Sequence, residues 1–94
     1  LRIRDPAADL AVLFALASAV RDRPLPADTA FLGEIALSGT IRSVPASTRR
    51  LAELGRAGFT RCVGPRSMEA PAGIEVAGVR TVRDALASVF GTGS

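Results

Sequence analysis

The sequence contains no histidine and no lysine, and these two absences exclude most ways of activating a nucleophile. Without histidine, no imidazole can accept the proton of a serine or cysteine. All 12 basic residues are arginine, which stays protonated at any working pH, so a serine–lysine dyad is also impossible. A phosphate-binding loop that ends in Gly-Lys-Ser/Thr is excluded for the same reason. The nine acidic residues are scattered among the arginines, as is typical of surface charge.

Cysteine and aromatic residues are also scarce. The single cysteine, Cys62, has no partner within the chain for a disulfide, and no His/Cys cluster is present to hold zinc. Its apolar neighbours predict a place in the core, and one unpaired thiol fits a reducing compartment, so we expect a cytoplasmic protein. Tryptophan and tyrosine are absent and aromatics make up only 4% of the chain, which predicts a core of aliphatic side chains.

Length and hydropathy limit the architecture. A chain of 94 residues has room for one domain, and its 48% apolar content with a net charge of +3 argues against disorder. The segment from Leu1 to Arg4 leads into a helix without the pattern of a cleavable signal peptide. The apolar run from Leu10 to Val20 is too short to span a bilayer, which takes roughly 20 residues, so no membrane partner is expected.

The first half of the chain predicts a strand tail, a helix and a hairpin. Leu1 to Ile3 alternates as a strand does, and Asp5 followed by Pro6 is a strong helix start. That helix runs to about Val20 and is apolar on nearly every side, which predicts burial on nearly every side. Thr29 to Leu37 is predicted as one largely buried strand that turns back into Thr40 to Val44. Gly33 and Glu34 within it are expected to keep strand geometry, with Gly33 allowing close backbone approach; the alternative is a functional loop.

The second half predicts further elements, in this order: a helix from about Ser47 to Ala57, a strand from Phe59 to Val63, a loop from Gly64 to Gly73, a short strand from Ile74 to Val76 and a helix capped by Thr81. Ser47 or a residue near it is expected to cap the first of these helices, and Gly58 to end it. The resulting order, β-α-β-β-α-β-(β)-α, predicts an α/β (α+β two-layer) domain with one sheet.

Three segments resemble a known family. Asp5-Pro6-Ala7-Ala8-Asp9-Leu10-Ala11 opens the apolar helix, Phe31-Leu32-Gly33-Glu34-Ile35-Ala36-Leu37-Ser38-Gly39-Thr40-Ile41-Arg42 forms the hairpin, and Arg56-Ala57-Gly58-Phe59 ends the next helix. Together they resemble the C-terminal Lon-protease-like domain of the bacterial DNA-repair protein RadA (Sms). The resemblance implies the Lon-protease-like, or ribosomal protein S5 domain 2-like, fold. Residues 1–90 would be the later part of that domain, and residues 91–94 a flexible tail.

The resemblance also implies how the chain departs from active proteases. The nucleophilic serine of Lon-type proteases matches Ala7, and the lysine base matches Thr48. The implied domain is therefore catalytically inactive. The whole protein would be an ATP-driven DNA motor that acts beside the RecA recombinase in recombination. Its ATP, magnesium and zinc sites would lie in upstream domains, so no cofactor is expected in this chain.

Assembly and DNA binding are the functions that the resemblance implies for this domain, through a hexameric ring. The candidate DNA-binding residues are arginines, whose planar guanidinium matches phosphate oxygens: Arg21, Arg23, Arg42, Arg49, Arg50 and Arg56. The alternative for these six is a solvated surface in which they pair with Asp22, Glu34 and Glu53. The alternative function is a protease-like module used only for protein–protein assembly, without DNA contact.

Overall fold

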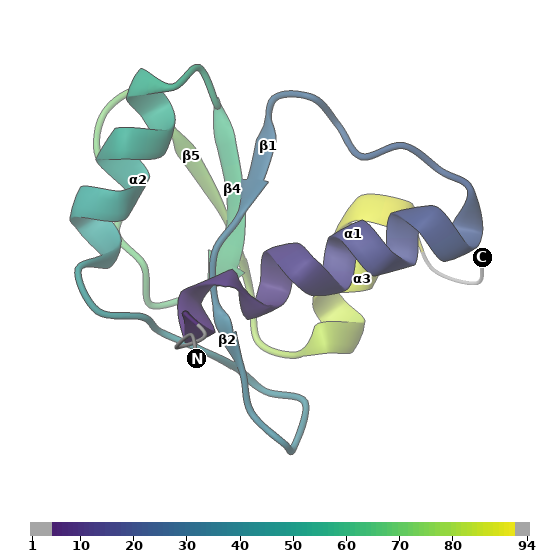
Figure 1. Ribbon diagram of the computed structural model, residues 1–94. Helices are drawn as coiled ribbons and strands as arrows, with labels where there is room; N and C mark the ends of the chain where they lie inside the picture. The colour runs from purple at the N-terminus through teal and green to yellow at the C-terminus, as the bar shows by residue number, and fades with distance from the viewer. Residues whose placement is uncertain (1–4, 92–94) are drawn as a thin grey trace, which may run out of the picture.

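The computed structural model describes residues 5–91, in which three α-helices and five β-strands alternate in an α/β arrangement (Figure 1). The elements are η1 (Pro6–Ala8), α1 (Asp9–Arg21), β1 (Thr29–Phe31), β2 (Glu34–Ile35), β3 (Ile41–Arg42), α2 (Ser47–Arg56), β4 (Arg61–Pro65), β5 (Glu75–Val79) and α3 (Val82–Phe90). The strand expected at Leu1–Ile3 and the tail expected after Gly91 lie outside the described residues.

The strands form two sheets, where the sequence predicted one. Three parallel strands are ordered β1-β4-β5, and β2 pairs antiparallel with β3. The single strand expected over Thr29–Leu37 is wrong, because it breaks at Leu32–Gly33. The Gly33 backbone bonds to the first helical segment instead: its N–H donates to the carbonyl of Ala7 and its carbonyl accepts from the N–H of Leu10, both at 3.1 Å.

Close approach at Gly33 explains the glycine there. Gly33 is buried, and an added Cβ would lie 2.9 Å from Cγ2 of Ile41. The predicted role of Gly33 in close backbone approach is thus confirmed, at a junction between two strands. The hairpin itself is also confirmed, with Ile35 opposite Ile41 and Glu34 opposite Arg42.

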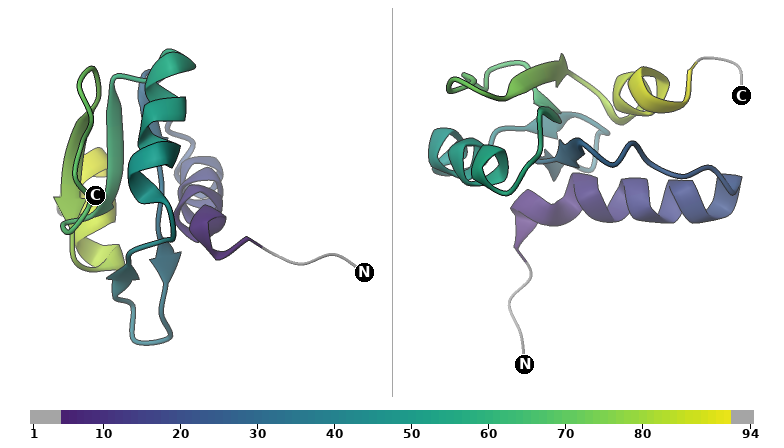
Figure 2. Two further views of the ribbon diagram at one scale, coloured as in Figure 1. Left: turned by 90° about the vertical axis from the view of Figure 1, so that its left-hand side faces the viewer. Right: turned by 90° about the horizontal axis from the view of Figure 1, so that it is seen from above.

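Helices cover both faces of the three-stranded sheet, so the two-layer arrangement expected from the sequence is wrong. Side chains of successive strand residues point to opposite faces. Ala30 and Cys62 pack in one cluster with Leu51 of α2. Phe31 and Val63, the next residues along, pack in the other cluster with side chains of α1 and α3. Figures 1 and 2 show α2 on one side of the sheet and the other two helices opposite it.

The core on the α1 side is built around Phe14. Its ring stacks on Phe31 with the centroids 4.2 Å apart and lies 5.9 Å from the ring of Phe90. Phe14 and Leu10 of α1 are fully buried. The outer face of the same helix is exposed, however: Val12 is 55% exposed, Leu16 61% and Val20 85%. The prediction that this helix would be buried on nearly every side is therefore wrong for this chain.

Most helix boundaries follow the local signals. The Asp5 carboxylate accepts from the N–H of Ala7 at 3.0 Å, and the Thr81 hydroxyl accepts from the N–H of Asp84 at 3.1 Å. Gly58 follows the end of α2 with φ +107°, a conformation that favours glycine. The side-chain cap expected from Ser47 or a residue near it is not observed, because Ala46 holds the N-cap position in a left-handed conformation without a side-chain hydrogen bond. Ser47 is instead the first residue of α2.

Candidate functional site

Ala7 and Thr48, the two positions that the resemblance would assign to the protease dyad, lie on elements that touch. Ala7 is 3% exposed and packs in the same cluster as Leu51 of α2, while Thr48 is exposed in the first turn of that helix. An ion pair between Arg50 Nη1 and Asp5 Oδ2, at 3.3 Å, also joins the two segments. Neither the methyl group of Ala7 nor the hydroxyl of Thr48 is a base, so these side chains carry no proton-transfer chemistry.

Asp5 is fixed at this contact from two directions. The backbone N–H of Ala7 lowers the pKa of the Asp5 carboxyl below its ordinary value, and the hydrogen bond and positive charge of Arg50 lower it further. Arg50 also donates from Nε to the carbonyl of Pro45 at 3.1 Å. Arg50, one of the expected DNA contacts, is thus occupied in holding α2 to the start of the first helical segment.

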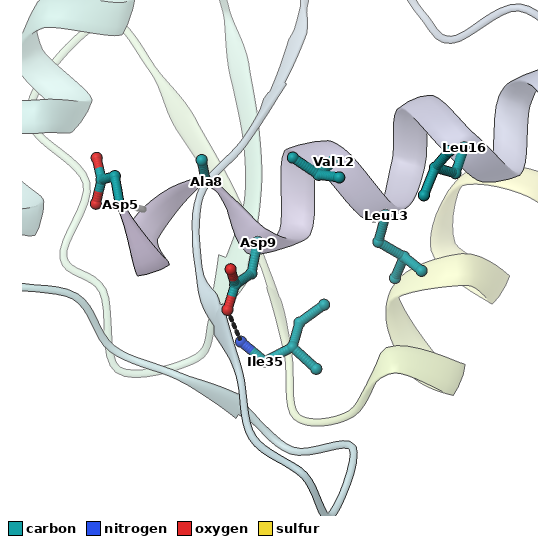
Figure 3. Close-up of a pocket in the computed structure, with 7 residues that line it drawn as sticks. All are labelled: Asp5, Ala8, Asp9, Val12, Leu13, Leu16 and Ile35. Atoms are coloured by element: carbon teal, nitrogen blue, oxygen red, sulfur yellow. Dashed lines mark hydrogen bonds between the residues drawn. The ribbon is translucent and has the colours of Figure 1, made fainter. Parts of the chain in front are cut away.

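An apolar groove of about 340 Å³ runs along the exposed side of α1, against the hairpin (Figure 3). Its lining residues are Asp5, Ala8, Asp9, Val12, Leu13, Leu16 and Ile35. The Ile35 N–H donates to Oδ2 of Asp9 at 3.1 Å, which ties the hairpin to the helix at this point. Except for the two carboxylates, every side chain that lines the groove is aliphatic, which suits contact with another apolar surface.

Two other large apolar side chains of the described residues are also exposed. Val20 continues the outer face of α1 beyond the groove, and Leu37 is fully exposed in the turn of the hairpin. Exposed apolar side chains that stand singly need no explanation, but a continuous group of them indicates a contact surface. We call Val12, Leu16 and Val20 the outer face of α1.

The arginines expected to contact DNA are not gathered on one surface. Arg21 and Arg23 lie at the end of α1, with their guanidinium carbons 4.8 and 5.3 Å from the centroid of the Phe90 ring. Arg23 also donates to the Phe90 carbonyl at 3.0 Å. Both therefore stabilise the contact between α1 and α3.

The other four candidates lie elsewhere. Arg49, Arg50 and Arg56 are on α2, on the opposite side of the sheet, and Arg42 is on β3 (Figure 1). Among the described residues, no ion pair joins any of the six to Asp22, Glu34 or Glu53, so the pairing expected in the alternative is not observed.

Two arginines outside the expected set share a groove with Arg42. Arg66 and Arg80 each come directly after the last residue of a parallel strand, Pro65 of β4 and Val79 of β5. The carboxyl ends of parallel strands meet at one edge of a sheet, which is where ligands bind in α/β folds. The position of each arginine directly after an apolar run could therefore have indicated a binding site in the sequence. That interpretation requires knowing that the two strands are parallel neighbours.

Cys62 is fully buried in β4 and its burial raises the pKa of the thiol to about 11, so it is an unreactive core residue as the sequence predicted. Within residues 5–91, no three His, Cys, Asp or Glu side chains lie together as metal ligands would. None of the helices in that range has the length and apolar character that crossing a bilayer requires.

No protein-family model matches this chain, and a search of curated proteins finds no relative in sequence.

Proposed function

We propose that this chain is a non-catalytic assembly domain, the later part of a Lon-protease-like domain in a RadA-type DNA-repair ATPase. Its role there would be to support a hexameric ring and to contribute to the binding of single-stranded or branched DNA in recombination. Ala7 and Thr48 at the positions of the protease dyad support the absence of peptidase chemistry in this proposal.

The assembly role is supported by the outer face of α1, which is apolar and exposed. Burying a Val or Leu side chain contributes about 1.5–3 kcal/mol relative to leaving it in water, so three such side chains represent several kcal/mol. A small domain has only about 5–15 kcal/mol of stability in total. A second copy of the chain is the partner that we expect on this face, because an assembly of like subunits covers the same surface in every copy.

Sedimentation velocity at low micromolar concentration tests the assembly role. We expect the chain to sediment as an oligomer and Leu16→Gln to shift it toward the monomer. Thr48→Gln is the matched control, because it places the same side chain at an exposed position of α2 and is expected to change nothing. A monomeric parent chain with cooperative unfolding would overturn the proposed assembly.

The second candidate function is a protease-like module for protein–protein assembly without DNA contact. It is favoured by the separation of the six candidate arginines, two of which contact Phe90 and one of which pairs with Asp5. Anisotropy of a labelled single-stranded oligonucleotide at two salt concentrations separates the two functions. Arg49→Glu with Arg56→Glu on α2 should weaken binding and flatten its salt dependence if that helix contacts DNA. Absence of binding would leave the assembly module.

A further inference from the structure

A groove of about 360 Å³ lies at the carboxyl-terminal edge of the parallel sheet, where β3 of the hairpin passes the ends of β4 and β5. Its floor is apolar and buried, and consists of Ile41, Pro65 and Val79. Its exposed rim is polar and consists of Arg42, Ser43, Arg66, Ser67 and Arg80. The groove is separate from the apolar groove along α1, with which it shares no residue.

Backbone hydrogen bonds hold the segments of this groove together. The Ile41 N–H donates to the carbonyl of Arg80 at 2.8 Å, and the Val82 N–H donates to the carbonyl of Gly39 at 2.9 Å. On another side, the hydroxyl oxygens of Ser43 and Ser67 lie 2.6 Å apart in a hydrogen bond. Three segments that are distant in sequence are therefore fixed next to one another before any ligand arrives.

Gly78 sets the position of Arg66. A Cβ at residue 78 would lie 3.0 Å from both Cα and Cγ of Arg66, so the arginine passes over the strand where that strand has no side chain. Such a contact is tighter than most contacts of a Cβ, so a larger residue at 78 would shift Arg66 by a few tenths of an ångström.

The charge of this groove is uncompensated within the described residues. Three arginines are among its lining residues and no acidic residue is. The acidic residue opposite Arg42 in the strand pairing is Glu34, yet no ion pair joins them, and none is present for Arg66 or Arg80 in residues 5–91. Three positive charges on residues of one groove, without a negative charge among them, favour an anion there.

From this arrangement we infer that the groove binds a compact phosphate-bearing ligand, either free pyrophosphate or the diphosphate of a nucleotide. Arginine forks match phosphate oxygens bidentately, and one of the two serine hydroxyls, which are bonded to each other, keeps its O–H as a further donor. The volume falls in the range of small-molecule sites, about 300–1,000 Å³. A nucleic-acid backbone would need cations continued along a line, whereas Arg49 and Arg56 lie on α2 and Arg21 and Arg23 lie at the end of α1. This inference is independent of the assembly role.

Isothermal titration calorimetry of the 94-residue chain in a phosphate-free buffer tests the inference, with pyrophosphate and ADP as the probes. We expect either probe to bind and Arg66→Gln or Arg80→Gln to weaken binding by about tenfold or more, because hydrogen bonds to charged groups are strong. Arg61→Gln is the matched control, since it removes the same charge from an exposed position at the opposite end of β4 and should leave affinity unchanged within about twofold. Thermal unfolding by circular dichroism checks that each variant is folded.

Binding of pyrophosphate identifies the phosphate group itself as the ligand, and binding of ADP without pyrophosphate identifies the nucleotide. Gly78→Ala provides a second measurement, because it keeps every charge and displaces Arg66, and it should also weaken binding. The inference is overturned if neither probe binds, if Arg61→Gln weakens binding as much as Arg80→Gln does, or if a single-stranded oligonucleotide binds while both small probes do not. Sedimentation of the parent chain remains a separate test of the proposed assembly.

Discussion

Helices α1 and α2 lie on opposite sides of the same sheet, and the surfaces that they present to solvent differ in chemistry. The outer side of α2 carries Arg49, Glu53 and Arg56, which are exposed and charged. The outer side of α1 carries Val12, Leu16 and Val20, which are exposed and apolar. Toward the sheet the two helices are alike, since each places fully buried side chains there: Leu51 on α2, and Leu10 and Phe14 on α1.

This difference indicates which of the two helices has a solvent-facing side that needs no partner to cover it. A helix whose solvent-facing side is charged is stable in water, because covering that side with another polypeptide would bury no apolar surface. A helix with an apolar outer side is stabilised when another polypeptide covers it. The α2 side is thus an ordinary surface, and the α1 side is the one where we expect a partner.

We expect the largest change in stability from a substitution on the buried side of α1, in comparison with one on its exposed side. Phe14→Ala should destabilise the domain by about 3–5 kcal/mol, because it leaves a cavity beneath the helix. Leu16→Ala, measured where the chain is monomeric, should change the free energy of unfolding by no more than about 0.5 kcal/mol. Urea unfolding followed by circular dichroism measures both. Equal costs for the two variants would mean that the outer face of α1 is covered within the monomer.

A second experiment measures how readily the α2 side of the sheet opens to solvent. Cys62 lies under α2, and burial raises its pKa from 9.0 to about 11. At pH 8 this shift alone lowers the thiolate fraction by about 100-fold, so iodoacetamide should modify the native chain at least that much more slowly than the urea-unfolded chain. The native rate should rise with pH up to about 11. A native rate close to the unfolded one would show that this side opens readily.

The smallest expected effect is a stabilisation of α2. Gly55 is helical, and a Cβ there would meet Cβ of Ile74 at 3.9 Å, an ordinary contact. Gly55→Ala should therefore raise stability by about 0.4–1 kcal/mol, mainly by restricting the unfolded chain. Gly58→Ala is the contrasting control, because φ there is +107° and a side chain is strained. Thermal midpoints distinguish the two, and a loss of stability with Gly55→Ala would mean that α2 packs more tightly than its contacts show.

Local signals in the sequence were sufficient for most of the elements. Asp5 with Pro6 set the start of the first helical segment, Thr81 set the start of α3, and Gly58 followed the end of α2, since each acts through its own backbone or side chain. The burial of Cys62 also followed from its apolar neighbours. These features depend on interactions within a few residues, which is why the sequence was enough to predict them.

Several features depended on contacts between distant residues. The strand expected over Thr29–Leu37 broke because the backbone of Gly33 bonds to Ala7 and Leu10, more than 20 residues earlier in the chain. The second helical layer, the scatter of the candidate arginines and the meeting of Arg42, Arg66 and Arg80 all follow from which strands pair and in which direction. By itself, the sequence determined the kinds of element, the caps at Asp5 and Thr81, and a composition without histidine or lysine. Tertiary structure decided which faces are covered and which charges meet, because strand order and packing are set by the whole chain folding at once.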